Sequence, residues 1–135
     1  MEPIRHTLSI LGHIVSKSDK EVFIRAHRDE LMDKIFRDAD SRRRYGFRKF
    51  KMPNSSIQGE LTVDKNYNTF SEVLEYLEKS SISRSRKREF FEYTLENFIA
   101  EDRDLLVGIF RGDLGIGVSK SQYNTIIGKN FVTFH

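Results

Sequence analysis

Apolar residues recur at intervals of three and four positions along most of the chain, which is the period of amphipathic helices. Three helices are predicted in the first third, beginning near residues 4, 18 and 29, and the third helix should reach about Ala39. Their expected core residues are Ile4, Leu8, Leu11 and Val15, then Val22, Phe23 and Ala26, and then Leu31, Met32, Ile35 and Phe36.

The same spacing predicts four further helices. Their expected core residues are Phe70, Val73, Leu74 and Leu77, then Phe90, Phe91, Leu95, Phe98 and Ile99, then Leu105, Leu106, Ile109 and Phe110, and finally Tyr123, Ile126 and Ile127. The whole pattern predicts an all-α fold, a compact multi-helix domain that covers residues 1–135.

Sequence signals for helix ends support several of these elements. A Ser or Thr followed three residues later by Glu or Gln is typical of a capping box. Gly112 can end the sixth helix, because the residue after a helix often needs a positive φ. Acidic residues at the start of that helix, Glu101, Asp102 and Asp104, favour the helix dipole. The capping boxes predicted in this way are Ser18 with Glu21, Thr69 with Glu72, and Ser119 with Gln122.

Two stretches lack a helical pattern. Met52 to Asn68 reads as a long surface connection, in which Ile57, Leu61 and Val63 suggest a short extended piece without a partner strand. A connection of that length is uncommon in a compact domain. The tail after Gly128 is expected either to lead into a following domain or to form a strand-like flap.

Composition narrows the possible functions. The chain has 135 residues, enough for one domain with a single core, and no Cys, which excludes disulfides and thiolate metal sites. Its histidines, His6, His13, His27 and His135, lack the spacing of a metal site. No apolar run reaches the roughly 20 residues that span a bilayer, and the first residues, Met-Glu-Pro-Ile, lack the charged-then-apolar form of a signal peptide. We expect a soluble cytoplasmic protein, in the host cytoplasm if the chain is viral.

Positive charge is concentrated rather than general, since the formal net charge is only +3. The first basic run, Arg42–Lys51, holds six cations and no acid, with Tyr45, Phe47 and Phe50 between them. Such a run repels itself unless it lies along an anionic surface, and Arg can bind phosphate through two bonds. Phosphate contact is therefore preferred over a solvated helix face. The candidate contacts are Arg42, Arg44, Arg48 and Lys49.

A second basic run, Arg84–Arg88, lies where a helix is expected to begin. Cations at that end oppose the helix dipole, at a cost of a few tenths of a kcal/mol each. Their position is informative because an anionic partner would offset this cost.

A glycine-rich turn joins the last two helices, with Gly112, Gly115 and Gly117 within six residues. A P-loop is excluded because Val118-Ser119 follows where Lys-Ser/Thr is required, and a Rossmann turn is excluded because no buried strand precedes the glycines. Main-chain N–H groups at this helix start, with Lys120 beside them, could bind a phosphate of the nucleic-acid backbone. An ordinary interhelical turn remains the alternative.

With these features in this order, the chain resembles the all-helical N-terminal DNA-binding domain of ATP-dependent DNA ligases, most closely the ligases of T-even bacteriophages. Three stretches carry the resemblance, of which the last is the most specific because it is similar to the family's Arg-x-x-Leu-x-x-Gly-x-Ser pattern. They are Leu31–Arg42, Tyr45–Pro53 and Arg111–Ser119.

The resemblance implies a helix–Gly-rich turn–helix element that holds nicked duplex DNA through minor-groove phosphates with little sequence preference, in DNA replication or repair. Adenylation in such ligases is performed by a separate nucleotidyltransferase domain, and its Lys-x-Asp-Gly motif is missing here. We therefore expect a monomer without catalytic residues, cofactor or metal of its own, with ATP and Mg²⁺ used only by a catalytic domain outside this chain. The implied DNA contacts are Arg111, Gly115, Gly117 and Ser119, and the residues themselves add Lys120.

Two other classes of function stay open. A protein–protein adaptor would use the basic runs to bind an acidic partner, and its glycine turn would be structural. A free-standing enzyme ranks last, because no Ser-His-acid set, carboxylate pair or metal triad has the required spacing.

Overall fold

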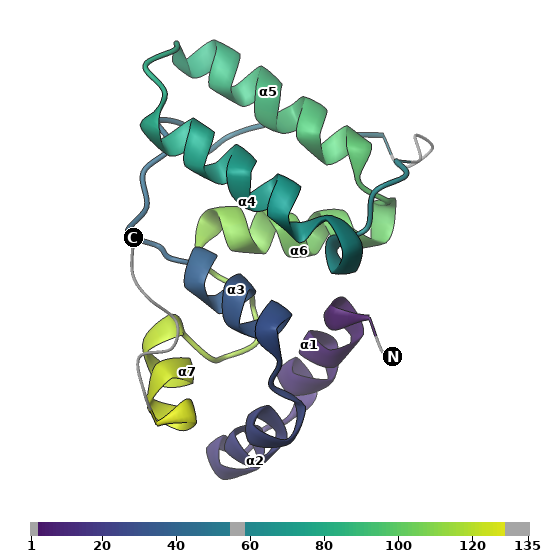
Figure 1. The fold of residues 1–135 in the computed structure, drawn as a ribbon, viewed down its shortest axis with the longest axis vertical. Coiled ribbons are helices and arrows are strands. Elements are labelled where there is room, and N and C mark those ends of the chain that lie inside the picture. Colours follow the sequence, from purple (N-terminus) through teal and green to yellow (C-terminus); the bar gives the residue numbers. More distant parts are fainter. Residues whose placement is uncertain (1–2, 55–58, 129–135) are drawn as a thin grey trace. The chain divides into compact units, whose positions relative to one another are not determined.

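A computed structural model describes residues 3–54 and 59–128, which form seven α-helices and one isolated β-bridge (Figure 1). The all-α prediction is confirmed. The chain divides into two compact units. The first unit consists of Met1–Ser41 and Gly108–His135, and the second unit consists of Arg42–Val107.

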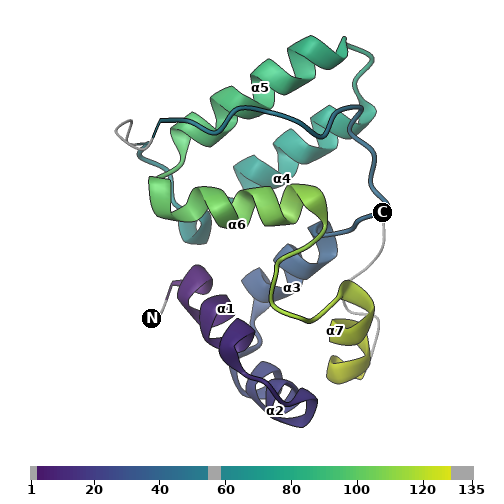
Figure 2. The same ribbon diagram turned by 180° about the vertical axis from the view of Figure 1, so that it is seen from behind.

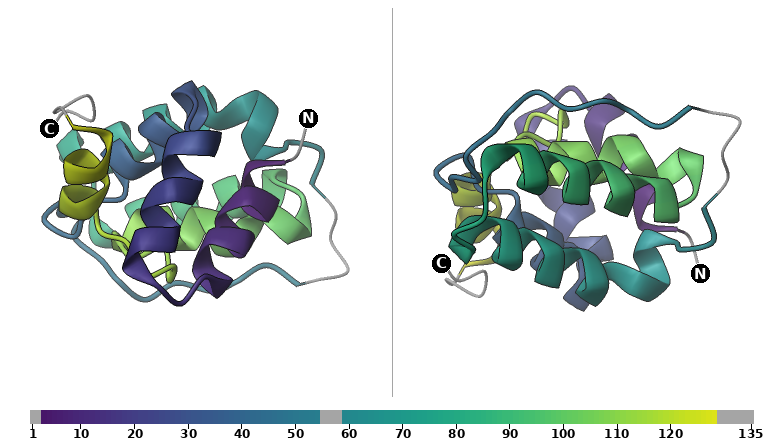
Figure 3. Two further views of the ribbon diagram at one scale, coloured as in Figure 1. Left: turned by 90° about the horizontal axis from the view of Figure 1, so that it is seen from below. Right: turned by 90° about the horizontal axis from the view of Figure 1, so that it is seen from above.

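The first unit contains α1 (Ile4–His13), α2 (Lys17–His27), α3 (Glu30–Asp38), the end of α6 (Ala100–Arg111) and α7 (Lys120–Ile127). Helices α1 and α2 lie side by side, and α7 packs on α2 and α3 (Figure 3, left). Their apolar faces form the core of this unit, which buries Ile4, Leu8, Leu11, Ile24, Met32, Ile35, Phe36 and Tyr123.

Helix α2 begins earlier than its sequence predicts. Ser16, not Ser18, is the capping residue, because its hydroxyl accepts the N–H of Asp19. This register buries Ile24 and leaves Val22 exposed, so the predicted core face of α2 is wrong. Val15 is also no core residue, since the chain leaves α1 at His13 and Val15 is 97% exposed.

The second unit contains α4 (Val63–Lys79), α5 (Arg84–Asn97) and most of α6. Helices α4 and α5 lie side by side (Figure 3, right). Phe70 of α4 meets both Phe91 and Phe98, with ring centroids 6.1 and 6.0 Å apart. The segment after Arg42 runs alongside α5 (Figure 2), and its Phe47 and Phe50 contact the ring of Phe91 edge-on.

Helix α4 begins six residues before Thr69, so the predicted cap at Thr69 is wrong. The main-chain N–H of Val63 donates to the Asp102 carboxylate at 2.9 Å, so a residue of α6 caps α4. Just before it, Leu61 forms a parallel bridge with Phe98, the partner that the sequence did not reveal. The long connection is therefore shorter than predicted. Ile57 lies outside the described residues.

No helix in the described part of the chain is long and apolar enough to cross a membrane. The predictions for the tail after Gly128 concern residues 129–135, which lie outside the described residues.

Candidate nucleic-acid interface

The glycine turn of the first unit begins where predicted. Helix α6 ends at Arg111, and Gly112 follows with φ +72°, a conformation that glycine adopts without strain. The N–H of Asp113 donates to the Gly108 carbonyl at 3.0 Å, as in a helix C-terminal motif. A side chain at Gly112 would collide with the backbone of Ser41, so glycine is required for packing as well.

Beyond this point the turn is open on one side. Gly115 and Gly117 are exposed, with φ +69° and +72°, whereas Ile116 between them is buried. The N–H of Gly115 donates to the Asp113 carboxylate at 2.9 Å and is therefore not offered to a ligand. Within the described residues, the N–H groups of Gly117 and Val118 donate no hydrogen bond. The N–H groups of Leu114 and Ile116 donate none either, so the turn has four unused main-chain donors, of which those of Gly117 and Val118 are nearest in sequence to α7.

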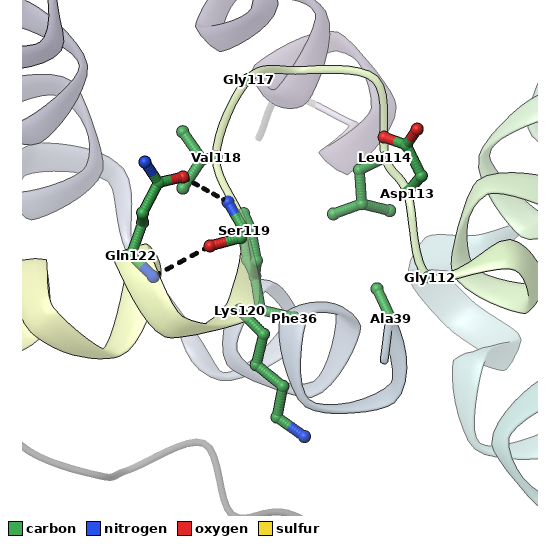
Figure 4. A pocket seen from close by; sticks show the side chains of 10 residues that line it. All are labelled: Phe36, Ala39, Gly112, Asp113, Leu114, Gly117, Val118, Ser119, Lys120 and Gln122. Carbon is green, nitrogen blue, oxygen red and sulfur yellow. Dashed lines mark hydrogen bonds between the residues drawn. The ribbon is translucent and has the colours of Figure 1, made fainter. Parts of the chain in front are cut away.

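The predicted capping box of α7 is confirmed. Ser119 Oγ accepts the N–H of Gln122 at 3.2 Å, and the side chain of Gln122 accepts the N–H of Ser119 at 2.8 Å (Figure 4). The N–H of Ser119 is thus occupied, but its exposed hydroxyl keeps a proton that it can donate.

Lys120 does not occupy the predicted position at the turn. Its side chain extends away from Gly117 (Figure 4) and is buried, with the whole residue 7% exposed. Its ammonium donates to the Arg37 carbonyl at 2.8 Å and to Asp40 at 3.2 Å. Lys120 therefore ties α7 to the end of α3, and we correct its assignment as a phosphate contact.

A cavity of about 270 Å³ lies beside the start of α7 (Figure 4). Its wall includes the carboxylate residue Asp113, which disfavours an anion on that side. The residues that line it are Phe36, Ala39, Gly112, Asp113, Leu114, Gly117, Val118, Ser119, Lys120 and Gln122. Arg111, the remaining predicted contact on this unit, is exposed at the end of α6.

A different lysine reaches the turn. The ammonium of Lys20, on α2, donates to the Ile116 carbonyl at 2.6 Å. The two residues are 96 positions apart, and Lys20 forms part of an ordinary polar helix pattern. Sequence reasoning missed Lys20 because no local signal links it to the glycines.

The second unit brings the two basic runs together at Gly46. A Cβ built on Gly46 would lie 3.9 Å from Cγ of Arg84 and 4.0 Å from Nζ of Lys87. The cations of the first basic run that were predicted to contact phosphate are all exposed, namely Arg42, Arg44, Arg48 and Lys49.

Arg43, the remaining arginine of that Arg-Arg-Arg triplet, has a structural role. It is buried, pairs with Glu78 through two contacts of 3.2 Å, and lies over the ring of Tyr45 at 5.4 Å from its centroid. This pairing anchors the first basic run on α4, so the adjacent Arg42 and Arg44 are held at the surface.

Most cations of the two basic runs form no ion pair in the described part of the chain. No acid of the described chain forms an ion pair with Arg48, Lys49, Lys51, Arg84, Arg86, Lys87 or Arg88. Other cations of the chain do pair, such as Arg25 with Glu21, Arg28 with Asp33 and Lys79 with Glu75. We call this set of seven cations the basic cluster. Lys87 is buried, with 9% of its surface exposed, and the Glu92 carboxylate accepts the main-chain N–H of Lys51. The exposed cations of the cluster, which form no ion pair, favour binding of a polyanion.

Among the described residues, no group of three or more His, Cys, Asp or Glu side chains could hold a metal ion. The sequence matches no protein-family model, and a comparison with curated proteins found no match either.

Proposed function

We propose that this chain is a duplex DNA-binding domain that holds the sugar-phosphate backbone with little sequence preference, as the N-terminal domain of an ATP-dependent DNA ligase does. The observation that carries the proposal is the basic cluster, of which Arg84 and Lys87 lie beside Gly46 of the first basic run. Two runs separated in sequence meet at Gly46, and none of the seven cations of the basic cluster forms an ion pair with an acid of the described chain.

The placement of the second basic run strengthens the case. Arg84, Arg86 and Lys87 lie in the first turns of α5, which has no acid in its first turn. That arrangement is unfavourable for an isolated helix, and a bound phosphate would offset the repulsion. The exposed glycine turn of the first unit adds main-chain donors, which suit phosphate contacts because they read no bases.

The salt dependence of binding tests the proposal. If about five to eight phosphates are neutralised, log K should fall linearly with log salt, with a slope of about −0.9 per phosphate. We would titrate labelled duplexes of unrelated sequence, both intact and nicked, between about 50 and 200 mM salt. Equal slopes for unrelated sequences are expected, whereas a flat profile would contradict phosphate binding.

A charge-matched pair of variants locates the contact. Arg48→Gln/Arg84→Gln removes two cations of the basic cluster and should reduce the slope by about 1.8. Arg25→Gln/Lys79→Gln removes the same net charge from exposed i,i+4 pairs with Glu21 and Glu75. This control should change the slope by much less. Equal changes in slope for the two variants would mean that binding depends only on the net charge of the chain and not on the basic cluster.

An adaptor that binds an acidic protein is the second candidate. It is favoured by an exposed aromatic group on α4 and α5, where Tyr76 and Phe90 lie 5.2 Å apart by ring centroid and Tyr93 is 63% exposed. Aromatic side chains are enriched at protein interfaces. An adaptor should bind polyglutamate as well as it binds duplex DNA, whereas a DNA-binding domain should prefer the duplex.

A further inference from the structure

Lys20 places a positive charge on the glycine turn of the first unit. Its ammonium has three donors and uses one on the Ile116 carbonyl, at 2.6 Å. The side chain is partly exposed, and no acid in the described part of the chain forms an ion pair with it. The carbonyl bond therefore fixes the ammonium beside the turn and leaves donors for another acceptor.

Gly117 leaves the space that this ammonium occupies. A Cβ at Gly117 would lie 2.6 Å from Nζ of Lys20, so a side chain there would require the ammonium to move. Gly115 has a similar φ, but a Cβ there would have no atom within 4 Å. Glycine at 117 thus has a spatial role that glycine at 115 lacks.

We propose that Lys20 is a phosphate-contacting residue of the glycine turn and provides the cation there in place of Lys120. The ligand is one backbone phosphate of the DNA strand, bound by the Lys20 ammonium together with the unused N–H groups of Gly117 and Val118. This inference rests on the proposed function and adds a residue to its binding surface.

Substitution of two lysines on one helix tests the inference. Lys20→Met should lower duplex affinity about fivefold near 0.1 M salt and reduce the salt slope by about 0.9, because one phosphate contact is lost. Lys17→Met removes the same charge from the exposed first residue of α2, which also forms no ion pair in the described chain. We expect the slope of Lys17→Met to match the unaltered chain. Lys20→Arg should retain the slope.

A double-mutant cycle connects Lys20 with Gly117. Gly117→Ala should displace the ammonium and weaken binding to about the level of Lys20→Met. In the Lys20→Met background, the same alanine should cause little additional loss of affinity, because the cation is already missing. Thermal unfolding of each variant, with Gly115→Ala as the reference for alanine at positive φ, separates backbone strain from lost contact.

The outcomes distinguish the two proposals. If the unaltered chain binds duplex DNA with a steep salt slope but Lys20→Met behaves like Lys17→Met, the role of Lys20 is wrong and the proposed function stands. Independent, multiplying losses from Lys20→Met and Gly117→Ala would also overturn it. If the unaltered chain shows no salt-dependent binding, both proposals fail.

Discussion

Tyr123 of α7 joins that helix to α3 and, through Asp33, to Arg28 at the end of α2. Its ring stacks on Phe36 with centroids 4.1 Å apart, and its hydroxyl donates to the Asp33 carboxylate. Arg28 donates to both oxygens of that carboxylate, each at 2.9 Å. Burial raises the pKa of Tyr123, and the bond to Asp33 raises it further. The hydrogen bond to Asp33 is also the main cause of a raised pKa for Arg28.

Tyr123→Phe should lower the free energy of unfolding by about 1.5 kcal/mol at neutral pH, since it removes a hydrogen bond to a charged group and keeps the stacked ring. A raised folded-state pKa means that the folded state keeps its proton above about pH 10, where the unfolded state loses it. The stability contributed by Tyr123 is therefore complete below pH 10 and falls above it.

The unaltered protein and Tyr123→Phe should therefore become more similar in free energy of unfolding at alkaline pH. Their difference should shrink by up to about 1.4 kcal/mol per pH unit. Urea unfolding from neutral pH to about pH 10.5 measures this change. Tyr93→Phe, at an exposed position, should change the stability by less than about 0.5 kcal/mol. A difference that stays constant with pH would show that the hydroxyl of Tyr123 is not buried.

Lysines show where sequence reasoning about single residues fails. Lys120 adjoins the glycine turn in sequence, yet it is buried against Asp40, whereas Lys20 reaches the turn from α2. A residue that adjoins the turn in sequence has its Cα near the turn, but a long side chain can still extend in another direction. The positive φ predicted for Gly112 is confirmed, since a positive φ depends mainly on the residue and its neighbours.

At the scale of elements, local capping signals were reliable only where the cap is local. Ser119 and Gln122 satisfy each other within one turn, and their capping box was predicted. Helix α4 begins where Asp102, 39 positions away, accepts the N–H of Val63. No pattern within residues 60–70 encodes that partner. The predicted extended piece at Leu61 lacked a visible partner for the same reason.

At the start of α5, a substitution that stabilises the helix is expected to weaken DNA binding, and both effects can be measured. Ser83 already accepts the N–H of Arg86, so Arg86→Glu would complete a capping box and replace a cation with an acid near the positive end of the dipole. We expect the free energy of unfolding to rise by about 0.3–1 kcal/mol. DNA affinity should fall, with a loss of salt slope of at least about 0.9.

Arg86→Gln is the matched variant, because Gln can also cap but adds no negative charge. It should give a smaller gain in stability and a similar loss of slope. Chemical denaturation and duplex titration on the same samples provide both values. Stabilisation by Arg86→Glu with unchanged DNA binding would mean that the second basic run is only a solvated helix face.

For the whole molecule, the candidate contacts fall on both compact units. The first unit carries the glycine turn, Arg111 and Lys20, and the second unit carries the basic cluster. The chain passes between the units twice, after Ser41 and within α6 after Val107. Helical periodicity could not reveal this division, because α6 reads as one continuous amphipathic helix across the boundary.

If both units hold the same duplex, their phosphate contacts should add. Combining Lys20→Met with Arg48→Gln/Arg84→Gln should reduce the salt slope by about 2.7, the sum of about 0.9 and about 1.8, while one chain still binds one duplex. Isothermal titration calorimetry gives the stoichiometry, and titration at several salt concentrations gives the slope. Two duplexes per chain would mean that the units bind DNA separately. The salt slope for binding at one unit would then change only with substitutions in that unit. A combined loss no larger than that of the second-unit variant would instead exclude the first unit from the interface, because counterion release counts every neutralised phosphate.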